Sequence, residues 1–176
     1  IPAGVHWAQF FAVFIPDEER GQAAIDYFDF NRRSFERQMK QFADRVVPCR
    51  TFSDMETAFA QNKTAAFLTI ENGSALAGDL SRAKELAEAG VRAITLVWNG
   101  ENEIGSGHNT NHGLSDFGRA VIPELERNGI LIDISHLNDT GFQDLLEVAK
   151  KPFLATHSNA RTLCGHKRNL KDQMIS

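Results

Sequence analysis

Short apolar runs alternate with stretches of helical periodicity along the whole chain. Each run is bounded by Pro, Gly, Asn, Asp or charged residues, which is typical of a buried β-strand between turns. The predicted strands cover residues 5–15, 65–70, 91–97, 130–135 and 152–156. Because helical segments separate them, the strands are expected to run parallel in an α/β fold.

The helical segments carry their own start signals. Recurring apolar residues predict a helix over residues 17–45 that is broken or bent near Asn31, and Ser53 is expected to cap a shorter helix after it. The expected caps of the three later helices are Asp79, Ser115 and Asn138.

Three residues able to bind a metal follow predicted strands. Glu71 closes the run 65–70, and His136 and His157 close the last two runs. Because parallel packing brings the carboxyl ends of neighbouring strands to one face, these side chains are expected to converge there. The pattern therefore predicts a metal-assisted active site.

Parallel strands of this kind build either an open doubly wound sheet or a closed barrel. The glycines form neither GxGxxG nor GxxxxGK[ST], the phosphate-binding patterns typical of the open sheet. This favours a (β/α)8 TIM barrel, which needs about 250 residues and eight repeats. The 176 residues supply only about five β/α units, so we expect residues 1–176 to be one domain and a partial barrel.

Composition excludes several classes of protein. The net charge of -4 and the lack of a dense basic run argue against nucleic acid or an anionic membrane as partner. No apolar run approaches the length of about 18 residues that a membrane span needs, and no signal-peptide pattern is visible. Cys49 and Cys164 lie far apart, outside any CxxC spacing. We therefore expect free thiols and a cytoplasmic location.

Each candidate ligand also has an alternative structural role. Glu71 could be a helix-capping or surface carboxylate, His136 could cap the following helix, and His157 could bind backbone. Asp133 lies within a predicted strand, where a buried carboxylate needs a partner. It could orient a metal-binding histidine or make a purely structural hydrogen bond.

Beyond these patterns, the sequence resembles the membrane dipeptidase (renal dipeptidase) family. The matching segments are IENG at 70–73, GLSDFGRAVIPELERNGILIDISH at 113–136, PFLATHSNARTLCGHKRN at 152–169 and VHWAQFFAVFIP at 5–16. The resemblance implies a (β/α)8 metallohydrolase with two zinc ions that cleaves dipeptides, including some with D-residues, by means of a metal-activated hydroxide.

The resemblance also implies roles for individual residues. Glu71 matches the carboxylate that bridges both zinc ions and is counted as catalytic, and His136 and His157 match the ligands of the second zinc. Arg168 matches an arginine that engages the substrate. Trp98 stands where mammalian members have a substrate-contacting histidine. The substrate-binding residues expected from this resemblance are Arg168, Trp98 and Asn99. The histidines expected to lie outside the metal site are His6, His108, His112 and His166.

The sequence departs from the family at both ends. The His-x-Asp pair that holds the first zinc in the family does not occur in the 176 residues, and a later catalytic aspartate would lie beyond Ser176. The chain also begins at Ile1 without an initiator Met. We therefore expect a fragment that lacks the first and last barrel strands, holds at most one zinc and is inactive alone.

Two other functions remain open at this stage. One is another binuclear metallohydrolase of the amidohydrolase type, acting on a cyclic amide or ester. The other is a metal-free, non-catalytic binding domain that keeps only the fold. A homodimer is expected by analogy with the family.

Overall fold

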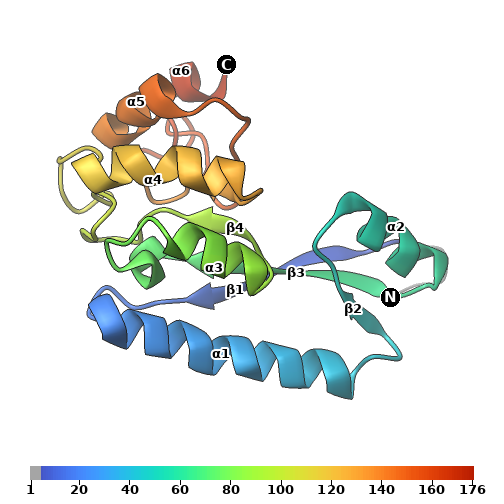
Figure 1. Ribbon diagram of the computed structural model, residues 1–176. Coiled ribbons are helices and arrows are strands. Elements are labelled where there is room, and N and C mark those ends of the chain that lie inside the picture. The colour runs from blue at the N-terminus through green and yellow to red at the C-terminus, as the bar shows by residue number, and fades with distance from the viewer. Residues whose placement is uncertain (1–4) are drawn as a thin grey trace.

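The computed structural model describes residues 5–176. Ile1–Gly4, including the start that suggested a fragment, lie outside the described residues. A parallel sheet forms the centre, with helices following its strands along the chain (Figure 1). The elements are β1 (Ala8–Phe14), α1 (Gly21–Gln41), β2 (Val46–Pro48), α2 (Phe52–Ala60), β3 (Thr64–Glu71), η1 (Gly73–Leu76), α3 (Arg82–Glu88), β4 (Val91–Thr95), α4 (Asp116–Arg127), β5 (Leu131–Asp133), α5 (Asp139–Val148) and α6 (Asp172–Ile175).

The sheet follows the order β1-β3-β4-β5, and every pairing is parallel, as the sequence predicts. β1 pairs with β3 along its length, from Ala8 opposite Ala65 to Phe14 opposite Glu71. On the other edge of β3, β2 pairs with residues 64–66 and β4 with residues from Leu68 onward. All carboxyl ends therefore point to one side of the molecule.

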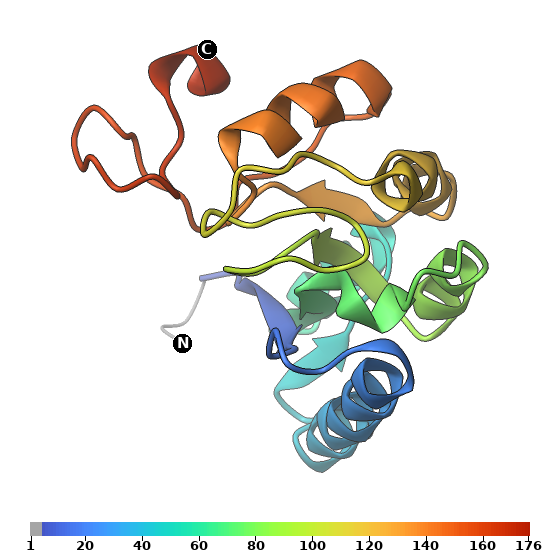
Figure 2. The same ribbon diagram turned by 90° about the vertical axis from the view of Figure 1, so that its left-hand side faces the viewer.

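The helices that follow β1, β3, β4 and β5 cover one face of this curved sheet (Figure 2), while α2 packs against Ala65 and Phe67 near the amino end of β3. α1, α3, α4 and α5 lie in an arc along that face, and buried aliphatic side chains such as Ile70, Ile94 and Ile132 form the core. The opposite face carries Ala12, Thr69 and Ala93 together with the packed rings of Phe10 and Phe67. This is the layering of a (β/α)8 barrel, of which the described residues form a part.

Two of the four predicted helix caps agree with the structure, and Ser53 and Asp79 do not. α3 begins at Arg82 after Ser81, and Asp79 instead accepts a hydrogen bond from the Ser81 backbone N–H before the helix. The Ser115 and Asn138 side chains accept hydrogen bonds from the backbone of Gly118 and Gly141, which begins α4 and α5. α2 instead begins after Thr51, two residues before the predicted cap. Thr51 and Asp54 form a reciprocal capping box there.

The prediction of a break near Asn31 is wrong, because α1 is continuous from Gly21 to Gln41. The Asn31 amide donates to the Tyr27 carbonyl one turn earlier, so this polar side chain is satisfied within the helix. The strand predicted at 152–156 is reduced to one bridge between Leu154 and Asp133. There the Thr156 backbone N–H donates to the Asp133 side chain instead of to a neighbouring strand.

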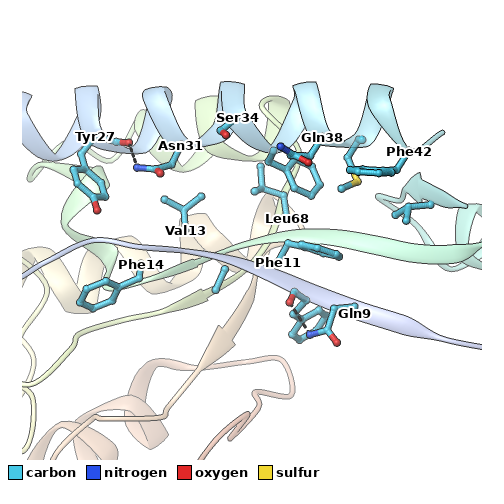
Figure 3. Close-up of a pocket in the computed structure, with 15 residues that line it drawn as sticks. Gln9, Phe11, Val13, Phe14, Tyr27, Asn31, Ser34, Gln38, Phe42 and Leu68 are labelled. Atoms are coloured by element: carbon cyan, nitrogen blue, oxygen red, sulfur yellow. Dashed lines mark hydrogen bonds between the residues drawn. The ribbon is translucent and has the colours of Figure 1, made fainter. Parts of the chain in front are cut away.

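A groove of about 840 Å³ runs between β1 and α1 (Figure 3). Its walls are mainly apolar and include Phe11 and Val13 from the strand, Tyr27 from the helix and Phe42 directly after the helix. Among the described residues, β3 is the only strand that pairs with β1. The outer edge of β1 is therefore not paired with any described strand, and the groove lies uncovered beside it.

Candidate metal centre

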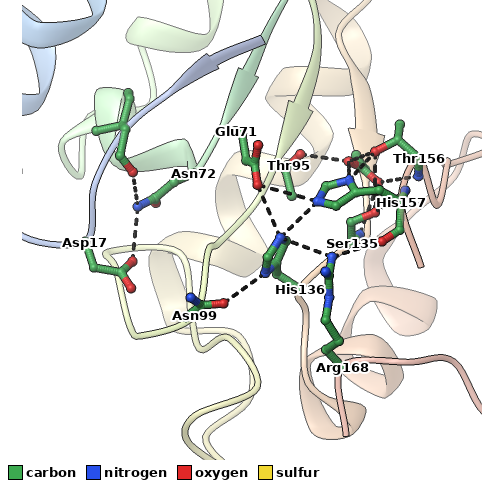
Figure 4. A network of polar contacts seen from close by, with 12 residues as sticks. Asp17, Glu71, Asn72, Thr95, Asn99, Ser135, His136, Thr156, His157 and Arg168 are labelled. Carbon is green, nitrogen blue, oxygen red and sulfur yellow. Dashed lines mark hydrogen bonds and ion pairs between the residues drawn. The ribbon is translucent and has the colours of Figure 1, made fainter. Parts of the chain in front are cut away.

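The ends of three chain segments bring the predicted ligands together. Glu71 is the last residue of β3, His136 follows β5, and His157 follows the bridge at Leu154. His136 has a φ of 69°, a left-handed conformation that non-glycine residues seldom adopt. Figure 4 shows the three side chains pointing toward one another.

The spacing of the three ligand atoms fits one cation. The Nε2 atoms of His136 and His157 lie 2.9 Å apart, and they lie 3.2 and 3.4 Å from Glu71 Oε1. Ligands held at about 2.0–2.1 Å around a tetrahedral zinc ion are separated by about 3.3 Å. Two imidazoles and a carboxylate are also a common donor set for zinc. Among residues 5–176, this is the one group of His, Cys, Asp or Glu side chains close enough to share an ion.

The charge of Glu71 suits this role. Its pKa is lowered chiefly by the hydrogen-bonding contact with His136 and further by the electrostatic effect of both histidine side chains, which together outweigh the opposing effect of burial. The carboxyl group is therefore ionised at neutral pH. An ionised carboxylate offsets part of the charge of a divalent cation.

Asp133 lies at the centre of a buried network beneath the ligands. Its side chain is only 2% exposed and accepts five hydrogen bonds, from Thr95 Oγ1 and from the backbone N–H and hydroxyl of both Ser135 and Thr156. Burial favours a raised pKa, but these hydrogen bonds outweigh it and lower the pKa of Asp133. The carboxylate joins the ends of three chain segments, and Asp133 Oδ2 lies 3.9 Å from His157 Nδ1.

Trp98 and Asn99 both lie beside His136. The Trp98 ring packs edge-on against Phe14, with centroids 4.8 Å apart, and its centroid is 6.4 Å from that of His136. Asn99 Oδ1 is 3.2 Å from His136 Nδ1. Substrate contact by these two residues stays a prediction, but their position beside a candidate ligand is a finding.

Arg168 lies at the rim of the same cluster. Its Nη2 lies 3.2 Å from His136 Nε2 and donates to the His157 carbonyl oxygen at 2.9 Å. The guanidinium therefore lies within reach of a molecule bound at the three ligands. Its role in binding substrate stays a prediction.

Two further residues, which the sequence patterns do not indicate as part of the site, lie beside it on loops. His108, from the long loop after β4, places its ring 5.9 Å from that of His136. Burial and the positive groups around it lower the pKa of His108 to about 4, so this ring is neutral at neutral pH. Asn72 donates to Ile15 O and Asp17, and thereby ties the ends of β3 and β1 together. Asn72 directly follows β3, whereas His108 lies far along the loop after β4 and carries no local sequence signal.

A charged clamp fixes the segment that carries His157 and Arg168. Arg161 makes two hydrogen bonds to Asp139 at the start of α5, at 2.6 and 2.8 Å, and Lys171 adds a third contact. The Arg161 hydrogen bond lowers the pKa of Asp139, with a further contribution from Lys171.

We expect Arg161→Gln to loosen this segment, which should be cleaved several-fold faster in limited proteolysis with chymotrypsin at neutral pH. The clamp is present above the ordinary aspartate pKa of about 3.9 and is lost as pH falls through the lower folded-state pKa of Asp139. In acid, the amide hydrogen exchange rates of this segment should therefore become the same in the variant and the parent. Arg45→Gln, at an exposed ion pair, is the matched control. Equal cleavage rates at neutral pH would contradict the clamp.

The fold and the ligand cluster together define the class of protein. A parallel α/β barrel segment with imidazole and carboxylate ligands at the carboxyl ends of its strands is the architecture of a barrel metallohydrolase. A family model agrees and is more specific. Residues 1–176 match the membrane dipeptidase family, peptidase family M19, and the chain belongs to this family.

Individual relatives are similar over most of this chain. An uncharacterized protein in the PQQ-III 3′ region of Acinetobacter calcoaceticus is 28% identical over 162 residues, which cover 88% of this chain and 51% of that protein. The structure of dipeptidase AC, a metallopeptidase of family M19, is 26% identical with a TM-score of 0.90, covering 96% of this chain and 55% of that one.

A metallopeptidase from Rhodobacter sphaeroides is 25% identical with a TM-score of 0.86, covering 94% of this chain and 56% of that one. That structure is liganded with a phosphinate mimic of the dipeptide L-Ala-D-Ala. The chain thus spans about half the length of the relatives that it matches.

Proposed function

We propose that the full-length protein is a zinc-dependent dipeptidase and that Glu71, His136 and His157 hold one of its metal ions. The observation that carries this proposal is the convergence of three ligand atoms, with separations of 2.9 to 3.4 Å, from segments remote in the chain. Membership of a metallopeptidase family supports it.

Each residue of the site has a distinct role in this proposal. A bound zinc ion would supply a Lewis acid and lower the pKa of water into the neutral range. Glu71 is the catalytic carboxylate, which balances cationic charge at the reaction centre. Arg168, at the rim, makes paired hydrogen bonds to the substrate carboxylate or to the oxygen that gains charge. Trp98 and Asn99 form the adjoining wall.

The relatives support the proposed substrate class. Dipeptides with either an L- or a D-residue at the carboxyl end are proposed substrates, since one relative binds a mimic of L-Ala-D-Ala. Family membership favours peptides over the cyclic amides or esters of other amidohydrolases. The described residues contain no helix that combines the length and apolar character needed to cross a bilayer. A homodimer and a cytoplasmic location stay predictions.

The test is hydrolysis of a dipeptide panel by the full-length protein. Chelator-treated protein should release no amino acid from L-Ala-L-Ala or L-Ala-D-Ala, and added zinc should restore release by at least about 100-fold. Failure of zinc, manganese and cobalt to restore hydrolysis would contradict the proposal. Hydrolysis of a cyclic amide in preference to every dipeptide would favour the other amidohydrolase function.

The 176 residues alone permit a separate measurement. Because they contain one ligand cluster and no His-x-Asp pair, elemental analysis after zinc dialysis should find about one zinc per chain. Absence of zinc would support the metal-free alternative for this segment.

A further inference from the structure

We propose that Asn99 and Thr156 are positioning residues that hold a proton on the Nδ1 atoms of His136 and His157, so that both Nε2 atoms present lone pairs to the metal. The proposal rests on the proposed metal site. It assigns to Asn99 a task other than substrate contact and gives Thr156 a role that its sequence position does not suggest.

The position of Thr156 determines the tautomer of His157. Thr156 Oγ1 donates its single proton to Asp133 Oδ2 in a hydrogen bond of 2.6 Å, and an ionised carboxylate can only accept. The same hydroxyl lies 2.8 Å from His157 Nδ1, toward which it can now only accept. His157 Nδ1 must therefore carry the proton and donate it. The nearby Asp133 carboxylate also favours a proton at this nitrogen.

Two contacts determine the tautomer of His136. The amide oxygen of Asn99 lies 3.2 Å from His136 Nδ1 and accepts the proton on that atom. On the other side of the ring, Arg168 Nη2 lies 3.2 Å from His136 Nε2. A guanidinium has only donors, so this contact requires a lone pair on Nε2. Both contacts select the same tautomer.

The consequence is a cluster of three acceptors. Both Nε2 atoms and Glu71 Oε1 face a common point, and they repel one another unless a cation or an added proton lies between them. Outer partners of this kind fix ring orientation and raise ligand basicity, and losing one costs about 10- to 100-fold in metal affinity. Figure 4 shows both partners on the side of each ring that faces away from Glu71.

Variants with and without the acceptor test the proposal. Thr156→Val and Asn99→Leu should each raise the zinc dissociation constant of the full-length protein by about 10- to 100-fold, measured by competition with a chelating dye. Thr156→Ser and Asn99→Asp keep the acceptor oxygen and should bind zinc within about threefold of the parent. Thr57→Val, which removes a hydroxyl on the exposed face of α2, is the matched control. Circular dichroism verifies folding of each variant.

A second measurement reports the tautomers without metal. At pH 8.5, nitrogen-15 NMR of histidine-labelled, metal-free protein should assign the proton of His136 and His157 to Nδ1. Protonated Nε2 atoms, or unchanged zinc affinity in Thr156→Val and Asn99→Leu, would overturn the proposal. If the parent protein binds no zinc, the proposed metal site fails, and the NMR result still decides the tautomers.

Discussion

Glu71→Gln is expected to weaken zinc binding by more than about 100-fold, beyond the loss typical of an outer partner. The amide keeps the size of the side chain but removes the negative charge that faces the two Nε2 atoms. A neutral oxygen cannot offset the charge of a dication. Hydrolysis of dipeptides by the full-length protein should fall by at least about the same factor, because the metal supplies the reaction chemistry.

Isothermal titration calorimetry with zinc measures the loss directly, and Glu56→Gln on α2 makes the same chemical change at an exposed position. The fold should survive, because Glu71 lies at the end of β3 and its side chain is not part of the apolar core. Zinc affinity within threefold of the parent would remove Glu71 from the metal site.

The second large effect is expected at Asp133. Asp133→Leu removes the acceptor of five hydrogen bonds at a site that is 2% exposed. Each buried donor left without a partner costs about 1–3 kcal/mol, and three of the five donors belong to the buried residues Thr95 and Ser135, so the free energy of unfolding should fall by at least about 3 kcal/mol. Urea unfolding of the metal-free protein measures it. Asp133→Asn, which keeps one acceptor oxygen, should lose about half as much.

The contribution of Asp133 also has a defined pH dependence. Because its pKa is lower in the folded protein, the stabilisation is fully present above the ordinary aspartate pKa of about 3.9. It is lost as pH falls through the folded-state pKa. The parent and Asp133→Asn should therefore differ most in stability at neutral pH and converge in acid. A constant difference across this range would mean that the carboxylate charge does not matter.

The sequence predicts the parallel sheet and the face that carries the site, because those features follow from local patterns. Apolar runs mark β1, β3 and β4, and the caps Ser115 and Asn138 lie where the pattern indicates. The three candidate ligands meet because each follows a strand of the same sheet.

Other features depend on contacts between distant segments and carry no local signal. β2 has three residues, too few for a periodic pattern, and its position on the edge of β3 is a result of packing. Asn99 lies opposite His136 because the loop after β4 packs against the segment that follows β5. The short hydrogen bond from Thr156 to Asp133 likewise joins residues 23 positions apart.

Because the outer edge of β1 is unpaired in the described chain, amide hydrogen exchange along β1 can detect a strand that pairs with this edge. Ile15 N–H donates to Glu71 O on β3, so by alternation the N–H groups of Phe10, Ala12 and Phe14 point to the other side. In deuterated water, these three amides would exchange rapidly, whereas the β1 amides that point toward β3 would exchange slowly. A strand added at this edge would slow exchange at the same three positions, which would reveal its register residue by residue.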